Sequence, residues 1–185
     1  MPISILTPRL ELREFAPEDA PHLQKICNQE HVLRWLPSWR TGLKDCETWI
    51  GWMRLHYKKA GARPSRFLGR TRRKPEPPRV LLAAVSRETG ELVGLVGVSA
   101  GPETGGLPEL TCLVAEEFLN RGYGREMVEA FCAWAFQSLP LDQIPAAADP
   151  ANHPACALLE GCGFVKVGFL KRPDSGGEER LHFQY

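Results

Sequence analysis

The residues best suited to chemistry lie in a glycine-containing turn between an apolar strand pattern and a helix pattern. Residues 113–124 read LVAEEFLNRGYG, and the helix pattern follows directly. The first N–H groups of a helix have no partner within the helix, and they carry partial positive charge. Gly122 and Gly124 place no Cβ between these groups and an anion. The turn therefore predicts a binding site for cofactor phosphates, although a tight, closely packed turn would need the same glycines.

A side-chain amide and a second, shorter helix pattern follow about thirty residues later. Asn152 precedes this pattern, and Gly163-Phe164 ends it. Asn is a preferred helix N-cap as well as a hydrogen-bonding group for ligands, and both roles remain open. Met127 stands where the dinucleotide fingerprint GxGxxG needs its third Gly, and no GxxxxGK[ST] loop is present. The turn and the amide together therefore predict another kind of site for a pyrophosphate-bearing cofactor.

The elements that must position these residues follow from hydrophobic periodicity. Alternation predicts a strand over 6–15, and Pro17 with two acids opens a helix. Helical spacing recurs over 43–57, 122–139 and 154–162, and strands are predicted at 80–85, 92–98, 109–115, 143–149, 165–170 and 180–185. The order predicts one mixed α+β domain over residues 1–185, built around a twisted sheet.

Composition argues against several classes of protein. The net charge is +1, so no overall field draws the chain to nucleic acid or to a membrane. The N-terminus has neither a basic segment nor a long apolar one, so we expect no signal peptide. Six cysteines without a CxxC pair indicate reduced core thiols in the cytoplasm, and five histidines without HxxxH or HExxH spacing predict no metal.

Residues 61–79 form a basic, proline-rich segment. They hold seven Lys or Arg, one Glu and four Pro. This composition predicts a flexible loop, and recruitment of RNA, of an acidic protein or of a cofactor phosphate is the alternative. Phe67 is the one aromatic ring in the segment, which argues against nucleic acid as a partner. The sequence does not distinguish a monomer from a homodimer.

At this point the chain resembles a known family. Val114 through Gly122-Tyr123-Gly124 resembles the central motif of the GNAT acetyltransferases, and Asn152 through Gly163-Phe164 resembles their following motif. Residues 7–13, which read TPRLELR, are similar to the start of the branch that acetylates the N-terminal alanine or serine of ribosomal proteins. The resemblance covers nearly the whole chain and is weakest at 61–79. It implies the acyl-CoA N-acyltransferase fold, in which one strand splays from its neighbour and acetyl-CoA lies in the gap.

The resemblance also implies roles for particular residues at the cofactor. Main-chain groups of Leu113 and Val114 would pair with the pantetheine amides. Asn152 would hydrogen-bond near the pantetheine or near the incoming amine. The pyrophosphate would be held by the turn that contains Asn120, Arg121, Gly122, Tyr123, Gly124 and Arg125.

The implied reaction is direct attack of an amine on acetyl-CoA in a ternary complex. Glu109 is the candidate general base, acting directly or through water, and a solvated strand-end carboxylate is the alternative. The family often supplies a proton from a Tyr or a Ser, but these positions hold Leu159 and Ala155. Cys156 is the nearest protic side chain, and it is either a proton donor or part of the pocket wall. These departures keep open a catalytically silent acyl-CoA-binding or RNA/ribosome-associated module.

The acceptor groove in this fold is usually roofed by the first two helices and their connection. Trp35 and Trp39 flank Leu36-Pro37-Ser38 in that connection, and we expect them to form a substrate wall. An α-amine, with a pKa of about 7.7–8.0, loses its proton more readily than a lysine at about 10.4. A peptide N-terminal amine is therefore the first expected acceptor, and a small-molecule amine is the second.

Overall fold

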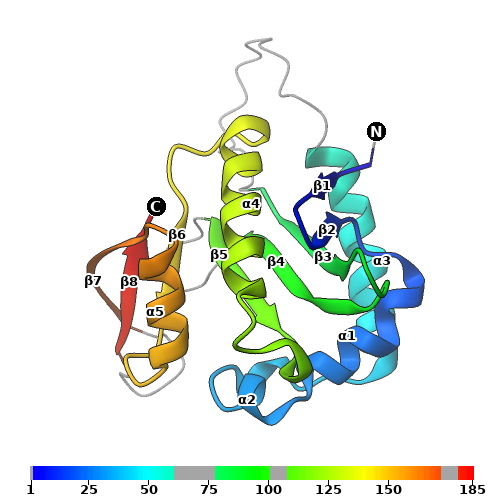
Figure 1. The fold of residues 1–185 in the computed structure, drawn as a ribbon, viewed down its shortest axis with the longest axis horizontal. Coiled ribbons are helices and arrows are strands. Elements are labelled where there is room, and N and C mark those ends of the chain that lie inside the picture. Colours follow the sequence, from blue (N-terminus) through cyan, green and yellow to red (C-terminus); the bar gives the residue numbers. More distant parts are fainter. Residues whose placement is uncertain (1, 61–77, 101–107, 172–178) are drawn as a thin grey trace, which may run out of the picture.

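The computed structural model describes residues 2–60, 78–100, 108–171 and 179–185, and its strands form two antiparallel sheets (Figure 1). The first sheet has five strands in sequence order: β1 (Ser4–Leu6), β2 (Leu10–Arg13), β3 (Val80–Ser86), β4 (Leu92–Ala100) and β5 (Pro108–Val114). The second has the order β6 (Pro145–Ala148), β8 (Glu179–Gln184), β7 (Val165–Lys171).

The two sheets meet where β5 lies beside β6. These strands contact each other, yet no ladder of hydrogen bonds joins them among the described residues. Pro145 has no N–H to donate, and the rest of β6 is alanine, so the strand offers little bulk to its neighbour. The single twisted sheet expected from the sequence is therefore two sheets with a splayed strand pair between them.

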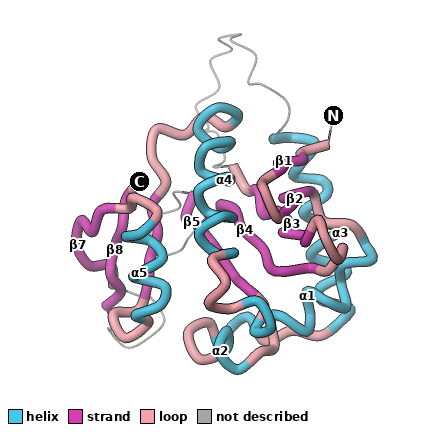
Figure 2. The backbone as a smooth tube through the Cα atoms, viewed as in Figure 1, coloured by secondary structure: helices cyan, strands magenta, loops and turns pink. Residues whose placement is uncertain are grey.

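Helices cover both faces of the five-stranded sheet (Figures 1 and 2). Every residue of β3 is buried, which requires cover on both sides because side chains alternate between the faces. α1 (Ala20–Cys27) and α3 (Leu43–Ala60) pack on one face, and α4 (Tyr123–Ser138) packs on the other. α5 (His153–Gly161) lies against the second sheet, and α2 (Glu30–Leu33) follows α1.

The N-terminal segment is a hairpin, whereas alternation predicted one strand over 6–15. Thr7 closes the turn, because its N–H donates to the Leu10 carbonyl at 2.9 Å. The Leu10 N–H donates back to Thr7 Oγ1 at 2.8 Å. The sequence shows only the alternation on each side of this turn, so the prediction joined β1 to β2.

The other predicted elements agree with the structure to within a few residues. A 3₁₀ turn at Pro17–Asp19 leads into α1, and α3 begins at the predicted Leu43. The predicted loop with Trp35 and Trp39 also contains α2 and a 3₁₀ turn at Pro37–Trp39. Most of the basic segment 61–79 lies outside the described residues. No helix in the described part is both long and apolar enough to span a membrane.

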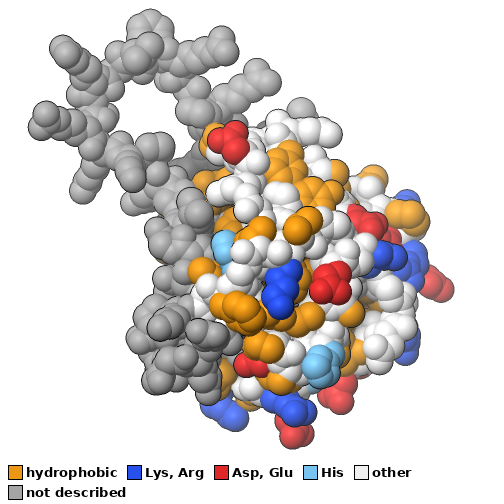
Figure 3. Space-filling view, turned by 90° about the vertical axis from the view of Figure 1, so that its left-hand side faces the viewer, with side chains coloured by type: hydrophobic (Ala, Val, Ile, Leu, Met, Phe, Trp, Pro, Cys, Tyr) orange, Lys and Arg blue, Asp and Glu red, His pale blue; other side chains and the backbone are white. Residues whose placement is uncertain are grey.

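The edge strand β7 of the second sheet carries exposed apolar side chains. Figure 3 shows hydrophobic groups gathered on this side of the molecule. The edge strand β7 contributes Val165, Val167 and Phe169, which are exposed to 64%, 50% and 57%. Lys166 Nζ lies 4.9 Å from the centre of the Phe169 ring. The edge strand is thus apolar over much of its length and has a cation beside its one aromatic ring.

Candidate functional site

The turn between β5 and α4 has the backbone form of an anion site. After a 3₁₀ turn at Glu116–Phe118, Asn120 and Gly122 adopt positive φ values of 59° and 79°. The first helical hydrogen bond of α4 runs from the Glu126 N–H to the Gly122 carbonyl at 3.2 Å. The N–H groups of residues 123–125 therefore have no partner within the helix. Successive free N–H groups after left-handed residues form a concave nest for an anion.

The side chains of this turn make two kinds of contact. Two of them contact Phe118 within the turn, and Arg125 contacts the end of α5. Arg121 is exposed, and its guanidinium lies 5.9 Å from the Phe118 ring. The Tyr123 ring packs edge-on against Phe118 at 5.7 Å. Arg125 instead donates to the Gly161 carbonyl at the end of α5 and pairs with Glu129 at 3.3 Å. Arg125 thus connects α4 to α5 through its side chain, while its main-chain N–H lies in the nest.

Gly124 serves close packing. A Cβ at this position would lie 3.3 Å from Leu158 Cδ2 and 3.5 Å from Val114 Cγ2. The missing side chain therefore lets α4 approach both β5 and α5. The packing explanation of Gly124 holds, and it is compatible with a main-chain contact to an anion.

The pairing of β5 with β4 decides which backbone groups face the gap beside β6. The Ala115 N–H donates to the Val93 carbonyl at 2.8 Å, and Val114 lies opposite Gly94 in the register. In an antiparallel pair, successive residues point their backbone groups alternately toward and away from the partner strand. The groups of Leu113 therefore face β4, and those of Val114 face the gap. Val114 is the residue of the predicted pair whose main chain is presented to a ligand there.

His31 on α2 reaches the same edge, which the sequence did not suggest. Its Nε2 lies 3.0 Å from the Val114 carbonyl oxygen. A carbonyl can only accept, so Nε2 is the donor in this contact. His31 Nδ1 is buried and has no hydrogen-bond partner among the described residues. A four-residue helix gives no periodic signal from which this contact could have been predicted.

Glu109 lies on the opposite face of β5 from α4. Val114 points toward α4, since its Cγ2 lies 3.5 Å from the Cβ position of Gly124. Side chains alternate along a strand, so Glu109, five residues earlier, faces α1 and α3. Its side chain is half-buried, and its Oε2 atom is shielded from solvent. The predicted base thus stands on the face where an acceptor groove was expected.

Asn152 and Cys156 begin α5 on the other side of the gap. Asn152 is the N-cap, and its Oδ1 accepts from the Ala155 N–H at 3.3 Å. The Asn152 Nδ2 group donates to none of the described residues, so capping leaves the amide donors for a ligand. Cys156 Sγ donates to the Asp149 carbonyl at 3.6 Å. Burial, aided by Glu160 and Asp149, raises the pKa of the Cys156 thiol, which suits a protonated donor better than a nucleophile.

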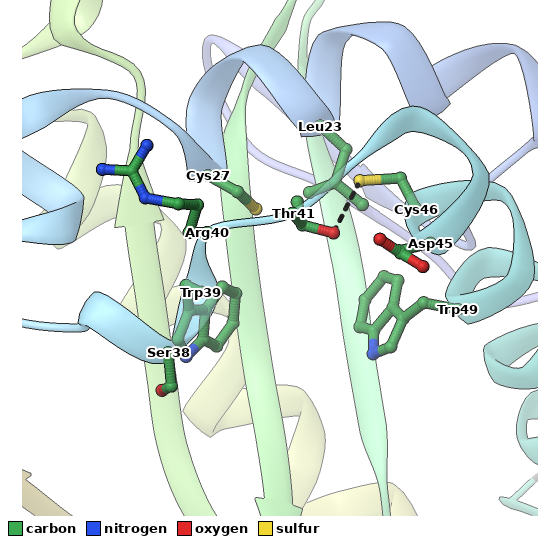
Figure 4. A pocket seen from close by; sticks show the side chains of 9 residues that line it. All are labelled: Leu23, Cys27, Ser38, Trp39, Arg40, Thr41, Asp45, Cys46 and Trp49. Carbon is green, nitrogen blue, oxygen red and sulfur yellow. Dashed lines mark hydrogen bonds between the residues drawn. The ribbon is translucent and has the colours of Figure 1, made fainter.

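A cavity of about 300 Å³ opens between α1, α3 and the connection after α2 (Figure 4). Trp39 and Trp49 stand on two sides of it, and Asp45 is its one carboxylate. Its lining residues are Leu23, Cys27, Ser38, Trp39, Arg40, Thr41, Asp45, Cys46 and Trp49. These helices cover the face toward which Glu109 points.

The two predicted wall residues differ in their surroundings. Trp39 lines the cavity, whereas Trp35 does not. The Trp35 carbonyl accepts from Nη2 of Arg180 at 3.1 Å, and the Arg34 guanidinium lies 5.0 Å from the Trp35 ring. Arg180 is buried on β8, so this contact connects the α2 region to the second sheet. No group of three His, Cys, Asp or Glu side chains suited to a metal ion occurs in the described ranges.

A family model and a known relative both match this sequence. The family model "Acetyltransferase (GNAT) domain" matches residues 9–165. An uncharacterized N-acetyltransferase p20 of Bacillus licheniformis is 29% identical over 87 residues, which is 47% of this chain and 49% of that protein. The match thus spans about half the length of that relative.

Solved structures resemble the chain over nearly its whole length. A putative ribosomal-protein-serine acetyltransferase from Vibrio cholerae has a TM-score of 0.72 and 23% identity, covering 99% of this chain and 97% of that one. RimL, a ribosomal L7/L12 alpha-N-protein acetyltransferase in complex with coenzyme A, has a TM-score of 0.73 and 12% identity, with coverage of 99% and 97%. These likenesses confirm the expected mixed α+β fold with its splayed strands. With the family model matching most of the sequence, the chain belongs to the GNAT acetyltransferase domain family.

Proposed function

We propose that the protein is an acetyl-CoA-dependent N-acetyltransferase that acetylates a primary amine by direct attack in a ternary complex. One observation carries the proposal: the edge of β5 at Val114, where His31 contacts the carbonyl and no strand ladder forms, leads directly to the nest of free N–H groups at the start of α4. A strand edge suits the amides of pantetheine, and a helix N-terminus suits a pyrophosphate. Family membership supports the same use of both features.

In the proposed cofactor site, residues of the turn bind the pyrophosphate and residues beside the gap bind the pantetheine. The pyrophosphate is held by main-chain N–H groups of residues 122–125, with exposed Arg121 beside them. The pantetheine runs along β5 and pairs with the main chain of Val114. The Asn152 amide, whose Oδ1 caps α5, offers its Nδ2 donors to the pantetheine or to the amine. The thioester then lies farther along β5, toward Glu109.

The proposed chemistry begins with a neutral amine on the Glu109 face. A C–N bond to the acetyl carbon forms, the C–S bond of the thioester breaks, and the amine proton passes to Glu109 directly or through water. The departing thiolate takes a proton from solvent or from Cys156, which carries a proton at neutral pH but is a weak acid because burial raises its pKa. The side of the sheet that Glu109 faces also carries the Trp39 cavity, which supports Glu109 as the proposed base.

The proposed acceptor is a peptide N-terminal amine, with a small-molecule amine as the second choice. The cavity beside Trp39 is mostly apolar, and its two charged lining residues, Asp45 and Arg40, are of opposite sign, so its apolar walls are what suit an acceptor side chain. Trp39 is the proposed wall of this cavity, and Trp35 would act at its rim, on the connection held by Arg180. Two structurally similar proteins are named for ribosomal-protein substrates, which supports a peptide amine as the first class to screen.

Titration calorimetry with acetyl-CoA tests the cofactor site. Gly124→Glu is a poor probe because its Cβ would lie only 3.3 Å from Leu158 Cδ2, so a loss of binding could come from altered packing. Arg121→Glu is cleaner, since Arg121 is exposed and the change places negative charge at the turn. We expect micromolar binding to the wild type and a loss of about tenfold or more in the variant. Arg54→Glu, an equal charge change on exposed α3, should bind like the wild type.

A catalytically silent acyl-CoA-binding module is the second candidate. Ala155 and Leu159 stand at the positions where the family often has proton donors, and Leu159 is buried in the core. Mass spectrometry of a panel of peptides and amines separates the two functions. Acetyl transfer to any member supports the enzyme, whereas acetyl-CoA binding without transfer to any of them favours the silent module. Failure of the wild type to bind acetyl-CoA contradicts both.

A further inference from the structure

The N-terminal TPRLELR segment is held against the cofactor turn by Arg9. The Arg9 guanidinium pairs with the Glu126 carboxylate through Nη2 and Nε, at 2.6 and 2.7 Å from Oε2. The Arg9 main-chain N–H donates to Oε1 of the same carboxylate at 2.9 Å. Arg9 Nη1 donates to the Arg121 carbonyl at 2.8 Å, and the guanidinium lies 4.3 Å from the centre of the Tyr123 ring. One side chain thus contacts three residues of the turn and of the first turn of α4.

The contact with the Arg121 carbonyl fixes the peptide that leads into the nest. The Arg121–Gly122 peptide is trans, and in a trans peptide the C=O and N–H bonds point in opposite directions. Holding the carbonyl toward Arg9 therefore directs the Gly122 N–H away from it. Gly122 has a φ of 79° and no side chain to limit its rotation, so the turn depends on outside contacts for its shape.

The contact with Glu126 cancels a charge that would oppose an anion. Glu126 lies in the first turn of α4, where a carboxylate suits the helix dipole but repels a phosphate bound at the same N-terminus. Thr7 Oγ1 donates to Glu126 Oε1 at 2.6 Å, so the hairpin turn and Arg9 hold the carboxylate together. Burial opposes its charge, but the hydrogen bonds from Thr7 and Arg9 outweigh burial and lower the pKa of Glu126. The carboxylate is ionised, and Arg9 is its counter-charge.

We propose that Arg9 is a positioning residue for the cofactor turn, which fixes the Arg121–Gly122 peptide and neutralises Glu126 so that the nest accepts a diphosphate. Arg9 acts through the turn, and its contribution is to cofactor affinity rather than to the transfer step. The inference rests on the proposed function, because the diphosphate is that of acetyl-CoA.

The test is a double-variant cycle read by calorimetry with acetyl-CoA. Arg9→Gln leaves Glu126 charged and uncompensated, so we expect at least about tenfold weaker binding. Adding Glu126→Gln removes the repulsion, so the double variant should recover part of that loss. A purely structural role for the pair would not give recovery, because the double variant loses more native contacts than the single one. Arg54→Gln on exposed α3 is the charge-matched control and should bind like the wild type.

The variants are first compared by circular dichroism melting without acetyl-CoA. If Arg9→Gln does not fold, Arg9→Lys is measured by itself, since it keeps the charge beside Glu126 and loses the contact that holds the Arg121 carbonyl. Weaker binding than the wild type then supports the positioning role, and wild-type affinity overturns it. Wild-type affinity in a folded Arg9→Gln protein overturns the proposal, and so does a loss that the double variant shares in full. Failure of the wild type itself to bind acetyl-CoA contradicts the proposed function instead, so the two failures are distinguishable.

Discussion

At the scale of single residues, Glu109 is the side chain whose role is most open to test. If it takes the amine proton, Glu109→Gln should lower kcat by roughly 10²–10³-fold at neutral pH. Acetyl-CoA affinity should change little, because the Glu109 side chain faces away from α4 and the cofactor turn. Steady-state acetylation followed by mass spectrometry from pH 6 to 9 measures both quantities. Glu88→Gln, in the exposed turn between β3 and β4, is the control, and an unchanged pH–rate profile for Glu109→Gln would remove Glu109 as the base.

Glu117 offers a pH prediction at the same scale. A hydrogen bond from Lys25 is the largest cause that lowers the pKa of Glu117 to about 2, and Gln29 Nε2 also donates to it, at 3.1 Å. A carboxyl group with a lowered folded-state pKa contributes stability above its unfolded value near 4.5, and this contribution disappears as the pH falls toward 2. Lys25→Ala should therefore destabilise slightly at pH 6, with a difference that shrinks by pH 2. Urea unfolding at several pH values measures it, and a difference independent of pH would contradict this assignment.

At the scale of elements, the close approach of β4 to β5 predicts the effect of a small substitution. A Cβ on Gly94 would lie 2.0 Å from the Leu113 carbonyl oxygen, so Gly94→Ala forces the strands apart next to Val114. We expect a loss of about 2–4 kcal/mol in the free energy of unfolding, together with weaker acetyl-CoA binding. Gly51→Ala is the matched control, because a Cβ there meets nothing within 4 Å. Gly51 lies inside α3, so this control should gain about 0.5–1 kcal/mol, and equal effects of the two changes in urea unfolding would contradict the strand argument.

The same scale shows what the sequence could and could not predict. Long periodic segments such as α3 and α4 were predictable because their patterns extend over several turns, and the Gly122 turn was marked by its residue types. The β1–β2 hairpin was not, because Thr7 closes the turn by hydrogen bonds that leave no pattern. The pair of Arg9 with Glu126 joins residues 117 positions apart, and only the fold brings such residues together.

At the scale of the whole molecule, no ladder of hydrogen bonds joins β5 to β6 among the described residues, so packing, the connecting segments and side-chain bonds such as that from Arg180 to the Trp35 carbonyl hold the two sheets together. Because the strands are divided into two sheets, the proposed cofactor site lies between them. β5 supplies the strand edge and the Glu109 face, and the start of α5 supplies Asn152 from the other side. The sequence indicated the motifs on both sides of the gap, but it could not show that Val114 rather than Leu113 faces it. That choice depends on the register with β4, which is a property of the assembled sheet.

The alternation of backbone N–H groups along β5 predicts how acetyl-CoA changes hydrogen exchange in this strand. The backbone N–H groups of Cys112 and Val114 face the gap, whereas those of Thr111 and Leu113 face β4. Acetyl-CoA bound along β5 should therefore slow hydrogen exchange at Cys112 and Val114 far more than at Thr111 and Leu113. Hydrogen exchange followed residue by residue by NMR, with and without acetyl-CoA, distinguishes this alternating protection from a general gain in stability. A general gain would raise the protection of all four amides together, by about 2.7 kcal/mol when acetyl-CoA is at a hundred times its Kd. Uniform protection would mean that the cofactor stabilises the fold without lying along this edge, and the alternating pattern would place it there.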